Sequence, residues 1–281
     1  MRTYSNCIVC YMRQVLEALE MNVADESLKI KTLLGFADAM KSMDFRRSPF
    51  ENTGILQAVL AKALGNADPY RNAKSEMNKK AIEIVGSIER ELLTFTLESA
   101  IKMSAAGNLL DYGPSVKKDE ITIYEKFKEP IYGNGYEKFL DEIEKERLKI
   151  GFLADNAGEV FFDKPLVRLL AVRGHLITYF IKSHPWINDA MLEDAEIAGI
   201  NNYAMLDFVP ISNWELKLRG PEFLEKLRNF DVIIAKGQGN FETLGEIPNL
   251  NCFYLLIAKC KLVAKELGTE TGRIVLKRAQ P

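Results

Sequence analysis

The sequence predicts an α/β protein in which an all-helical amino-terminal part precedes a Rossmann-like, mostly parallel sheet with helices on both faces. Three observations support this prediction. Apolar residues recur at helical spacing through roughly the first 110 residues. From residue 149 onward, short apolar runs alternate with helical segments, which is typical of parallel β–α units. The chain has 281 residues, 47% of them hydrophobic, which is enough to bury a core without disulfides.

Charge and hydropathy argue against several classes of protein. The formal net charge is −2, from 37 basic and 39 acidic side chains, so the composition provides no general basic surface for nucleic acid. No stretch reaches the apolar length that spans a membrane. The first ten residues contain one arginine and no long apolar core, unlike a secretory signal. We therefore expect a cytoplasmic protein that binds neither nucleic acid nor a membrane. The composition leaves its oligomeric state open.

The amino-terminal part is expected to be helical throughout. Apolar residues fall on one face of each of the segments 12–19, 27–41, 53–64 and 69–106. Ser48-Pro49 and Gly65-Asn66 are start and stop signals around the third segment, and Gly107-Asn108 ends the last.

A connecting region follows and has a mixed pattern. Ile121–Tyr124 fits a short strand, Gly133–Gly135 a turn, and Tyr136–Arg147 a charged helix. We therefore predict a helical domain over residues 1–113, a connecting segment over 114–148 and an α/β domain over 149–281 that carries the functional site.

The α/β domain alternates strands with helices. The expected strands are Ile150–Ala154, Leu176–Ile181, Tyr203–Val209, Val232–Ala235, Cys252–Ile257 and Arg273–Leu276. The expected helices are Phe161–Arg173, Asp189–Ala198, Pro221–Asn229 and Ala258–Leu267. Helices of this length between short strands predict a sheet covered on both faces.

Polar turns follow four of these strands. They are Asp155–Glu159, Ser183–Asp189, Lys236–Glu242 and Lys259–Lys261. Ligands of open parallel sheets bind beyond the carboxyl ends of the strands, so these turns are expected to meet at one edge.

The side chains of these turns indicate phosphoryl chemistry. Asp155 and Asp189, with the amides of Asn156 and Asn240, offer oxygen ligands of the kind that Mg²⁺ and Mn²⁺ prefer. Lysines and helix amino termini suit a phosphate, and a cation between them would neutralise its charge.

A simpler interpretation is that each turn only caps a helix, but four such turns at one edge favour a functional site. The sequence contains no GxGxxG after the first strand, no Walker A motif and no GxSxG elbow.

Taken in order, the motifs resemble those of the metal-dependent damage-control phosphatases, also called domain of unknown function 89. The motifs are Cys7-Ile8-Val9-Cys10, Asp68-Pro69-Tyr70 with Lys74 and Asn78, Gly107–Asp111, Asp155–Glu159, Asn188-Asp189, Lys236–Asn240 and Lys259-Cys260. They span most of the chain, and the CxxC is similar to that of the short microbial branch.

The resemblance implies a helical domain joined to a Rossmann-like domain, and hydrolysis of small phosphomonoesters. It implies that Asp155, Asn156 and Asp189 bind the cation and that Lys259 binds the phosphate, these four being the expected catalytic residues. The expected substrate-binding residues are Asn108, Asp111, Glu159, Ser183, Lys236 and Asn240.

Several points stay open at this stage. Mg²⁺, Mn²⁺, Co²⁺ and Ni²⁺ all suit oxygen-rich sites, and the partner is expected to be a sugar phosphate or another small, damaged phosphometabolite. Either water or a carboxylate attacks phosphorus, and Asp155 or Glu159 would orient a water.

Other functions fit the same sequence. A nucleotide- or S-adenosylmethionine-binding protein, or a methyltransferase, would use the same cleft. An electron-transfer or metal-storage protein would use the four cysteines. Cys7 and Cys10 have the spacing of a second metal or redox site, and a helix-start pair without metal explains them equally well.

Overall fold

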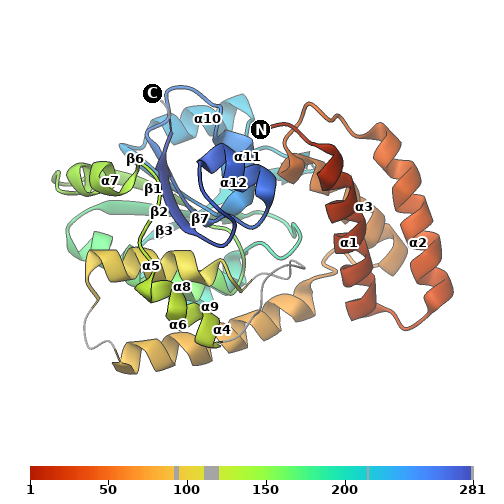
Figure 1. Ribbon diagram of the computed structural model, residues 1–281, viewed down its shortest axis with the longest axis horizontal. Coiled ribbons are helices and arrows are strands. Elements are labelled where there is room, and N and C mark those ends of the chain that lie inside the picture. Colours follow the sequence, from red (N-terminus) through yellow and green to blue (C-terminus); the bar gives the residue numbers. More distant parts are fainter. Residues whose placement is uncertain (92–94, 111–119, 214, 280–281) are drawn as a thin grey trace.

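The computed structural model describes residues 1–91, 95–110, 120–213 and 215–279, and it confirms the predicted fold class (Figure 1). Its centre is a six-stranded sheet in the order β3-β2-β1-β6-β7-β8. All neighbouring strands are parallel except β7 and β8, which are antiparallel. The strands are β1 Lys149–Leu153, β2 Leu176–Lys182, β3 Met205–Val209, β6 Val232–Lys236, β7 Cys252–Ile257 and β8 Ile274–Arg278.

Helices cover both faces of this sheet (Figure 1). The amino-terminal helices are α1 Ser5–Asn22, α2 Glu26–Ala39, α3 Pro49–Leu64, α4 Arg71–Glu91 and α5 Leu97–Gly107, with a 3₁₀ turn at Met40–Ser42. The later helices are α6 Glu120–Lys128, α7 Tyr136–Ile143, α8 Glu159–Val172, α9 Leu192–Ala198, α10 Pro221–Arg228, α11 Gly237–Leu244 and α12 Lys261–Leu267, with a 3₁₀ turn at Ile200–Asn202. A short hairpin pairs β4 Ile211–Ser212 with β5 Glu215–Leu216.

Two hydrophobic cores lie on opposite faces of the sheet. Successive side chains of a strand point to opposite faces, so Phe253 and Leu255 enter the core that α4, α5 and α8 share. Tyr254 and Leu256 enter the other core, with α1, α3, α11 and α12. Because helices α4 and α5 are part of a core that contains the sheet, the two predicted domains are in contact. Their proposed boundaries at residues 113 and 148 stay a prediction.

One predicted strand is wrong. Ile121–Tyr124 is not a strand but lies within α6. β-branched residues favour a strand locally, but tertiary packing overrides this preference. Ile123 is buried, and Phe127, one helical turn later, packs against the same core, so the helical spacing serves burial.

The topology explains why the predicted turns meet. β1 lies between β2 and β6, and the chain runs outward from β1 in both directions. The carboxyl ends of β1, β2, β6 and β7 share one edge because these strands are parallel. Such a reversal of strand order is where ligands of open α/β sheets bind. In the described part of the chain, no helix is long and apolar enough to cross a membrane.

Candidate functional site

The turns after β1 and β2 are fastened to each other by backbone hydrogen bonds. Asn156 and Asp189 face each other in an isolated antiparallel bridge. The Ala157 N–H donates to the Asn188 carbonyl at 3.0 Å, and the Ala190 N–H donates to the Asp155 carbonyl at 2.8 Å. The side chains of the two turns are therefore held at one place on the sheet edge.

A cavity of about 340 Å³ opens beside these turns. Its sheet side is lined by Asp155, Asn156, Asn188, Asp189, Gln238, Glu242, Lys259, Cys260 and Lys261, among others. Its opposite wall comes from the amino-terminal helices and includes Cys7, Cys10, Tyr11, Phe50 and Thr53. The helical part and the sheet thus build the cavity together, with the oxygen-rich turns at its base.

Asp155 is packed closely against α11. Gly237, the first residue of α11, has a φ of +73°, and a Cβ atom there would lie 1.8 Å from Asp155 Oδ2. Asp155 Oδ2 also accepts hydrogen bonds from Asn108 Nδ2 at 2.8 Å and from Asn156 Nδ2 at 3.1 Å. Only glycine leaves room for the carboxylate in this position.

A buried ion cluster lies directly behind Asn156. Glu159 Oε1 accepts from Asn156 Nδ2 at 2.7 Å and from Asn108 Nδ2 at 2.5 Å. Its other oxygen, Oε2, lies 3.1 Å from Lys236 Nζ, which also donates to Asp163 Oδ1 at 2.7 Å. Burial opposes the charge of Lys236, but the carboxylates of Asp163 and Glu159 outweigh it and raise the pKa of this lysine.

Further donors complete the cluster around Asp163. Ser104 Oγ donates to Asp163 Oδ1 at 2.5 Å, and the Tyr179 hydroxyl donates to Oδ2 at 2.7 Å. Burial raises the pKa of Asp163 above its ordinary value, while Lys236 opposes that rise. Glu159, Asp163 and Lys236 are fully buried, so the cluster supports the site from below and does not enter the cavity.

The ammonium group of Lys182 is buried beside Asp189. Lys182, the last residue of β2, places Nζ 2.9 Å from Asp189 Oδ2, and both side chains are almost completely buried. The sequence did not point to Lys182. The sequence does contain one signal for this ion pair, because Lys182 ends an apolar strand and the turn that follows contains Asp189.

The motif around Asp68 holds the loop that follows Asp189. Lys74 Nζ lies 2.8 Å from Asp68 Oδ2 and 3.3 Å from Met191 Sδ. Asn78 Nδ2 donates to Asp194 Oδ1 at 2.7 Å, and Asp194 Oδ2 accepts from the Met191 N–H at 2.8 Å. These contacts tie α4 to the loop between β2 and α9, so this motif fixes the position of the loop.

The structure brings most of the predicted residues together, in two layers. Asp155, Asn156, Asp189, Lys259, Cys7 and Cys10 line the cavity. Asn108, Glu159, Lys236 and Asn240 are buried and are not part of the lining. Asn240 Nδ2 donates to the carbonyls of Ala154 and Lys236 and so supports the ends of β1 and β6.

Two predicted residues remain. Ser183 is not part of the cavity lining either, because its hydroxyl accepts from the Ile211 N–H at 3.0 Å, toward the β4–β5 hairpin. Asp111 lies outside the described residues.

The donor set suits a hard divalent cation that is completed by substrate and water. In the part of the chain that the structure describes, no three His, Cys, Asp or Glu side chains converge on one point. Mg²⁺, however, is commonly held by one or two carboxylates together with waters and substrate phosphate. Within the described residues, both hydrogen bonds of the Asn156 carboxamide use Nδ2 as the donor. Its Oδ1 is therefore the amide atom left for the cavity, beside Asp155 and Asp189.

Thiols line the same cavity from both of its walls. Cys7, Cys10 and Cys260 all line it, whereas Cys252 is buried. Desolvation raises the pKa of Cys7 and raises that of Cys10 to about 11. A metal or redox role for Cys7 and Cys10 stays a prediction.

Glu242 is an unusual carboxyl in the cavity wall. Burial raises its pKa to about 7, although a hydrogen bond from Gln238 Nε2 at 2.7 Å and the amino group of Met1 both favour its charge. Its charge therefore changes within the neutral pH range.

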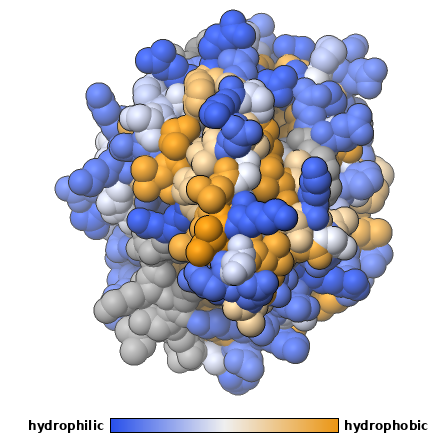
Figure 2. All heavy atoms as spheres, turned by 90° about the vertical axis from the view of Figure 1, so that its right-hand side faces the viewer, coloured by the Kyte–Doolittle hydropathy of each residue, from blue (hydrophilic) through white to orange (hydrophobic). Residues whose placement is uncertain are grey.

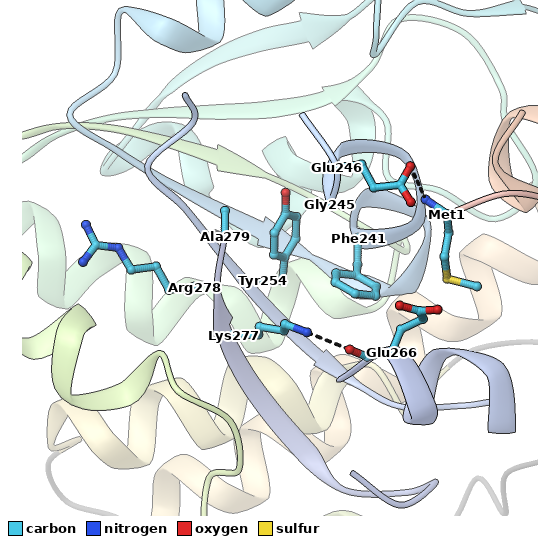
Figure 3. A pocket seen from close by; sticks show the side chains of 9 residues that line it. All are labelled: Met1, Phe241, Gly245, Glu246, Tyr254, Glu266, Lys277, Arg278 and Ala279. Atoms are coloured by element: carbon cyan, nitrogen blue, oxygen red, sulfur yellow. Dashed lines mark hydrogen bonds and ion pairs between the residues drawn. The ribbon is translucent and has the colours of Figure 1, made fainter. Parts of the chain in front are cut away.

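A second, smaller cavity of about 190 Å³ lies between α11, β7 and β8 (Figure 3). Charged groups around this cavity already have partners within the protein. The Met1 amino group lies 3.2 Å from Glu246 Oε2, and Lys277 Nζ donates to the Glu266 carbonyl at 2.7 Å. None of the predicted site residues lines it, so the larger cavity is the candidate active site.

Comparison with known proteins places the chain in a family. A family model described as the damage-control phosphatase ARMT1-like domain matches residues 3–275. The chain belongs to this family. The family predicted from the motifs is thereby confirmed, since a solved member of domain of unknown function 89, from Pyrococcus horikoshii, shares the fold. That structure has a TM-score of 0.88 and 29% sequence identity, and the match covers 100% of both chains.

Curated relatives agree with this placement. A protein of Pyrococcus horikoshii named damage-control phosphatase is 30% identical over 284 residues, which is 99% of this chain and 98% of that protein. An uncharacterized protein of Methanocaldococcus jannaschii is 30% identical over 291 residues, with 97% and 94% covered. A damage-control phosphatase of Archaeoglobus fulgidus is 28% identical over 236 residues, with 76% and 77% covered.

Proposed function

We propose that the protein is a phosphatase that hydrolyses small phosphomonoesters with a divalent cation, one of Mg²⁺, Mn²⁺, Co²⁺ or Ni²⁺. The observation that carries the proposal is the convergence of Asp155, Asn156, Asp189 and Lys259 on one cavity. Two relatives that span the same fold are named damage-control phosphatases, which supports the class of reaction.

The cation would be held by the carboxylates of Asp155 and Asp189 and by the carboxamide oxygen of Asn156. When bound, a divalent cation neutralises phosphate charge and polarises the P–O bond. Lys182 keeps Asp189 in place through their 2.9 Å ion pair, and the close approach of Gly237 keeps Asp155 in place. The chain thus supplies two fixed carboxylates and one amide oxygen to the same cavity.

The phosphate would lie between these ligands and Lys259. Lys259 and Lys261 follow β7 and both line the cavity, where positive charge stabilises the additional negative charge of a phosphoryl transition state. Glu159 is fully buried behind Asn156, whereas Asp155 lines the cavity. Of these two carboxylates, Asp155 would therefore orient an attacking water. The volume of about 340 Å³ suits a small metabolite such as a sugar phosphate.

Phosphate release from a panel of phosphomonoesters tests this proposal. The protein is first freed of metal with a chelator and then assayed with each of the four cations in turn. We expect no hydrolysis before metal is added and hydrolysis of at least one small phosphomonoester afterwards. Hydrolysis at the same rate without any cation would contradict the metal role. A rise in melting temperature with S-adenosylmethionine, but not with Mn²⁺, would favour the methyltransferase alternative.

A further inference from the structure

We propose that Glu159 is a positioning residue that, with Lys236, fixes which atom of the Asn156 carboxamide faces the cavity. This inference rests on the proposed function, because it concerns the residues that would hold the cation. It assigns a role to a buried ion pair that lies outside the cavity and touches neither the substrate space nor the expected phosphate lysine.

A cation site that uses an asparagine requires its carboxamide to have one fixed orientation. An asparagine carries an oxygen and an NH₂ group of nearly the same size, and only the oxygen can bind a cation. With both orientations allowed, Asn156 would present a donor to the cation for part of the time. Some neighbour must therefore accept hydrogen bonds from the NH₂ group and hold it away from the cavity.

Glu159 meets this requirement. Its Oε1 lies 2.7 Å from Asn156 Nδ2, and a carboxylate only accepts hydrogen bonds. Asp155 Oδ2, at 3.1 Å, accepts from the same nitrogen. The two acceptors together occupy both protons of the NH₂ group, and they leave Oδ1 for the cavity that Asn156 lines.

Lys236 keeps Glu159 available as an acceptor. A carboxylate without exposure to solvent needs a partner of opposite charge, and Lys236 Nζ lies 3.1 Å from Oε2. Lys236 is anchored in turn by Asp163 and by the Ser104 carbonyl, at 2.7 and 2.8 Å. The orientation of one amide at the cavity is thus set by a chain of buried contacts that ends on α5.

Asn108 connects Asp155 and Glu159 to the end of β7 by hydrogen bonds. Its Nδ2 donates to Asp155 Oδ2 at 2.8 Å and to Glu159 Oε1 at 2.5 Å. Its Oδ1 accepts from the Ile257 N–H at 3.3 Å, two residues before Lys259. Asn108 therefore links the metal-binding turn to the strand end that carries the phosphate lysine.

A donor–acceptor exchange tests the proposal. In Glu159→Gln, the ammonium of Lys236 selects the amide oxygen, since hydrogen bonds from charged donors are the stronger ones. The glutamine NH₂ then faces the NH₂ groups of both Asn156 and Asn108, which donate to this oxygen in the original protein. Asn156 must then turn its own oxygen toward the glutamine and away from the cavity. We expect the Kd for Mn²⁺ to rise about tenfold, measured by titration with calorimetry or electron paramagnetic resonance. Asn156→Asp alone is expected to weaken binding as well, because it adds a third carboxylate beside Asp155 and Glu159.

The double variant Asn156→Asp with Glu159→Gln restores a donor facing an acceptor and keeps the total charge. The introduced aspartate accepts from the introduced glutamine with one oxygen and presents the other to the cavity. We expect the double variant to bind Mn²⁺ more tightly than either single variant, a coupling that a double-mutant cycle measures. Should Glu159→Gln fail to fold, the comparison of Asn156→Asp with the double variant gives the same answer.

Asp25→Ala is the control for lost stability. It removes the side-chain cap of α2, where Asp25 Oδ1 accepts from the Ser27 N–H at 2.9 Å, and α2 contributes no residue to the cavity lining. We expect a lower melting temperature and an unchanged Kd for Mn²⁺. The proposal is overturned if folded Glu159→Gln binds Mn²⁺ as tightly as the original protein, or if the double variant binds no better than Asn156→Asp. These results leave the proposed function standing, whereas failure of the original protein to bind any of Mg²⁺, Mn²⁺, Co²⁺ and Ni²⁺ contradicts the proposed function itself.

Discussion

At the scale of single residues, the site depends on how closely Asp155 and Gly237 approach each other. The turn after β1 and the start of α11 come from segments far apart in the sequence, and a positive φ at Gly237 lets the backbone pass the carboxylate. A side chain at this position would compete with Asp155 for the same space.

Gly237→Ala is therefore expected to disrupt the site. The new Cβ would lie 1.8 Å from Asp155 Oδ2 and would occupy a left-handed backbone conformation, which alone costs about 1–2 kcal/mol. We expect weaker Mn²⁺ binding in a titration and a lower free energy of unfolding in denaturant. Gly35→Ala is the control, because its Cβ meets nothing within 4 Å in α2; it should stabilise the protein by about 0.5–1 kcal/mol. Unchanged Mn²⁺ affinity in Gly237→Ala would show that Asp155 is not held as described.

The sequence predicted which residues gather at this edge better than it predicted where their side chains point. Asp155, Asn156, Asp189 and Lys259 lie at the cavity as expected. Lys236 does not, because it follows Ile234 by two residues and so points to the same face, into the core beneath α8. The alternation of side chains along β6 predicts that Lys236 points into the core, but only once the face of the sheet that each residue of β6 occupies is known.

At the scale of elements, α11 forms in a segment whose sequence pattern predicted only a polar turn. Two glycines among its first three residues, Gly237 and Gly239, give it a weak intrinsic preference for helix. Packing compensates, since Phe241 and Leu244 are buried in the core that α11 shares with β7. A Cβ at Gly239 would lie 2.6 Å from the Phe50 ring, so the glycine that weakens the helix also lets α3 approach.

Glu242 on α11 is expected to make stability depend on pH. Burial raises its pKa from 4.5 to about 7, so the folded protein binds this proton more tightly than the unfolded chain does. The resulting stabilisation is complete below about pH 4.5 and is lost as the pH rises through 7. Relative to Glu242→Gln, the original protein should lose up to about 3 kcal/mol across this range. Denaturant unfolding at several pH values measures the difference, and parallel curves for the two proteins would refute the assignment.

Helix α2 shows how unevenly one element is buried. Figure 2 shows apolar side chains on the face of the molecule that carries the first three helices. On α2, Leu34 is 67% exposed, whereas Phe36, two residues later, is fully buried. The two positions therefore provide a matched pair on one helix.

Phe36→Ala should lower the free energy of unfolding by about 3–5 kcal/mol, because it leaves a cavity in the core. Leu34→Ala should change it by about 0.5 kcal/mol or less. Chemical denaturation of both variants measures these values. Equal losses would mean that Leu34 is covered in solution, contrary to its exposure here.

At the scale of the whole molecule, one cavity needs both parts of the chain. The mostly parallel sheet followed from the alternation of apolar runs and helical segments, and the structure confirms it. The order of the strands within the sheet was not predicted. The wall formed by α1 and α3 could not be predicted in the same way. Cys7 and Phe50 reach the cavity through packing between segments far apart in sequence, which local patterns do not encode. The buried cluster of Asp163, Tyr179 and Ser104 was missed for the same reason.

The central claim is that Asp155 belongs to a metal-dependent phosphatase site, and the rate of phosphate release by Asp155→Asn tests it most directly. Asp231→Asn is the matched control, because Asp231 accepts from the Lys149 N–H at the opposite end of β1. With Mn²⁺ and the best phosphomonoester of the panel, Asp155→Asn should lose activity by about a hundredfold or more while its melting temperature without metal stays near that of the control. Metal-dependent hydrolysis at the original rate in Asp155→Asn would contradict the account.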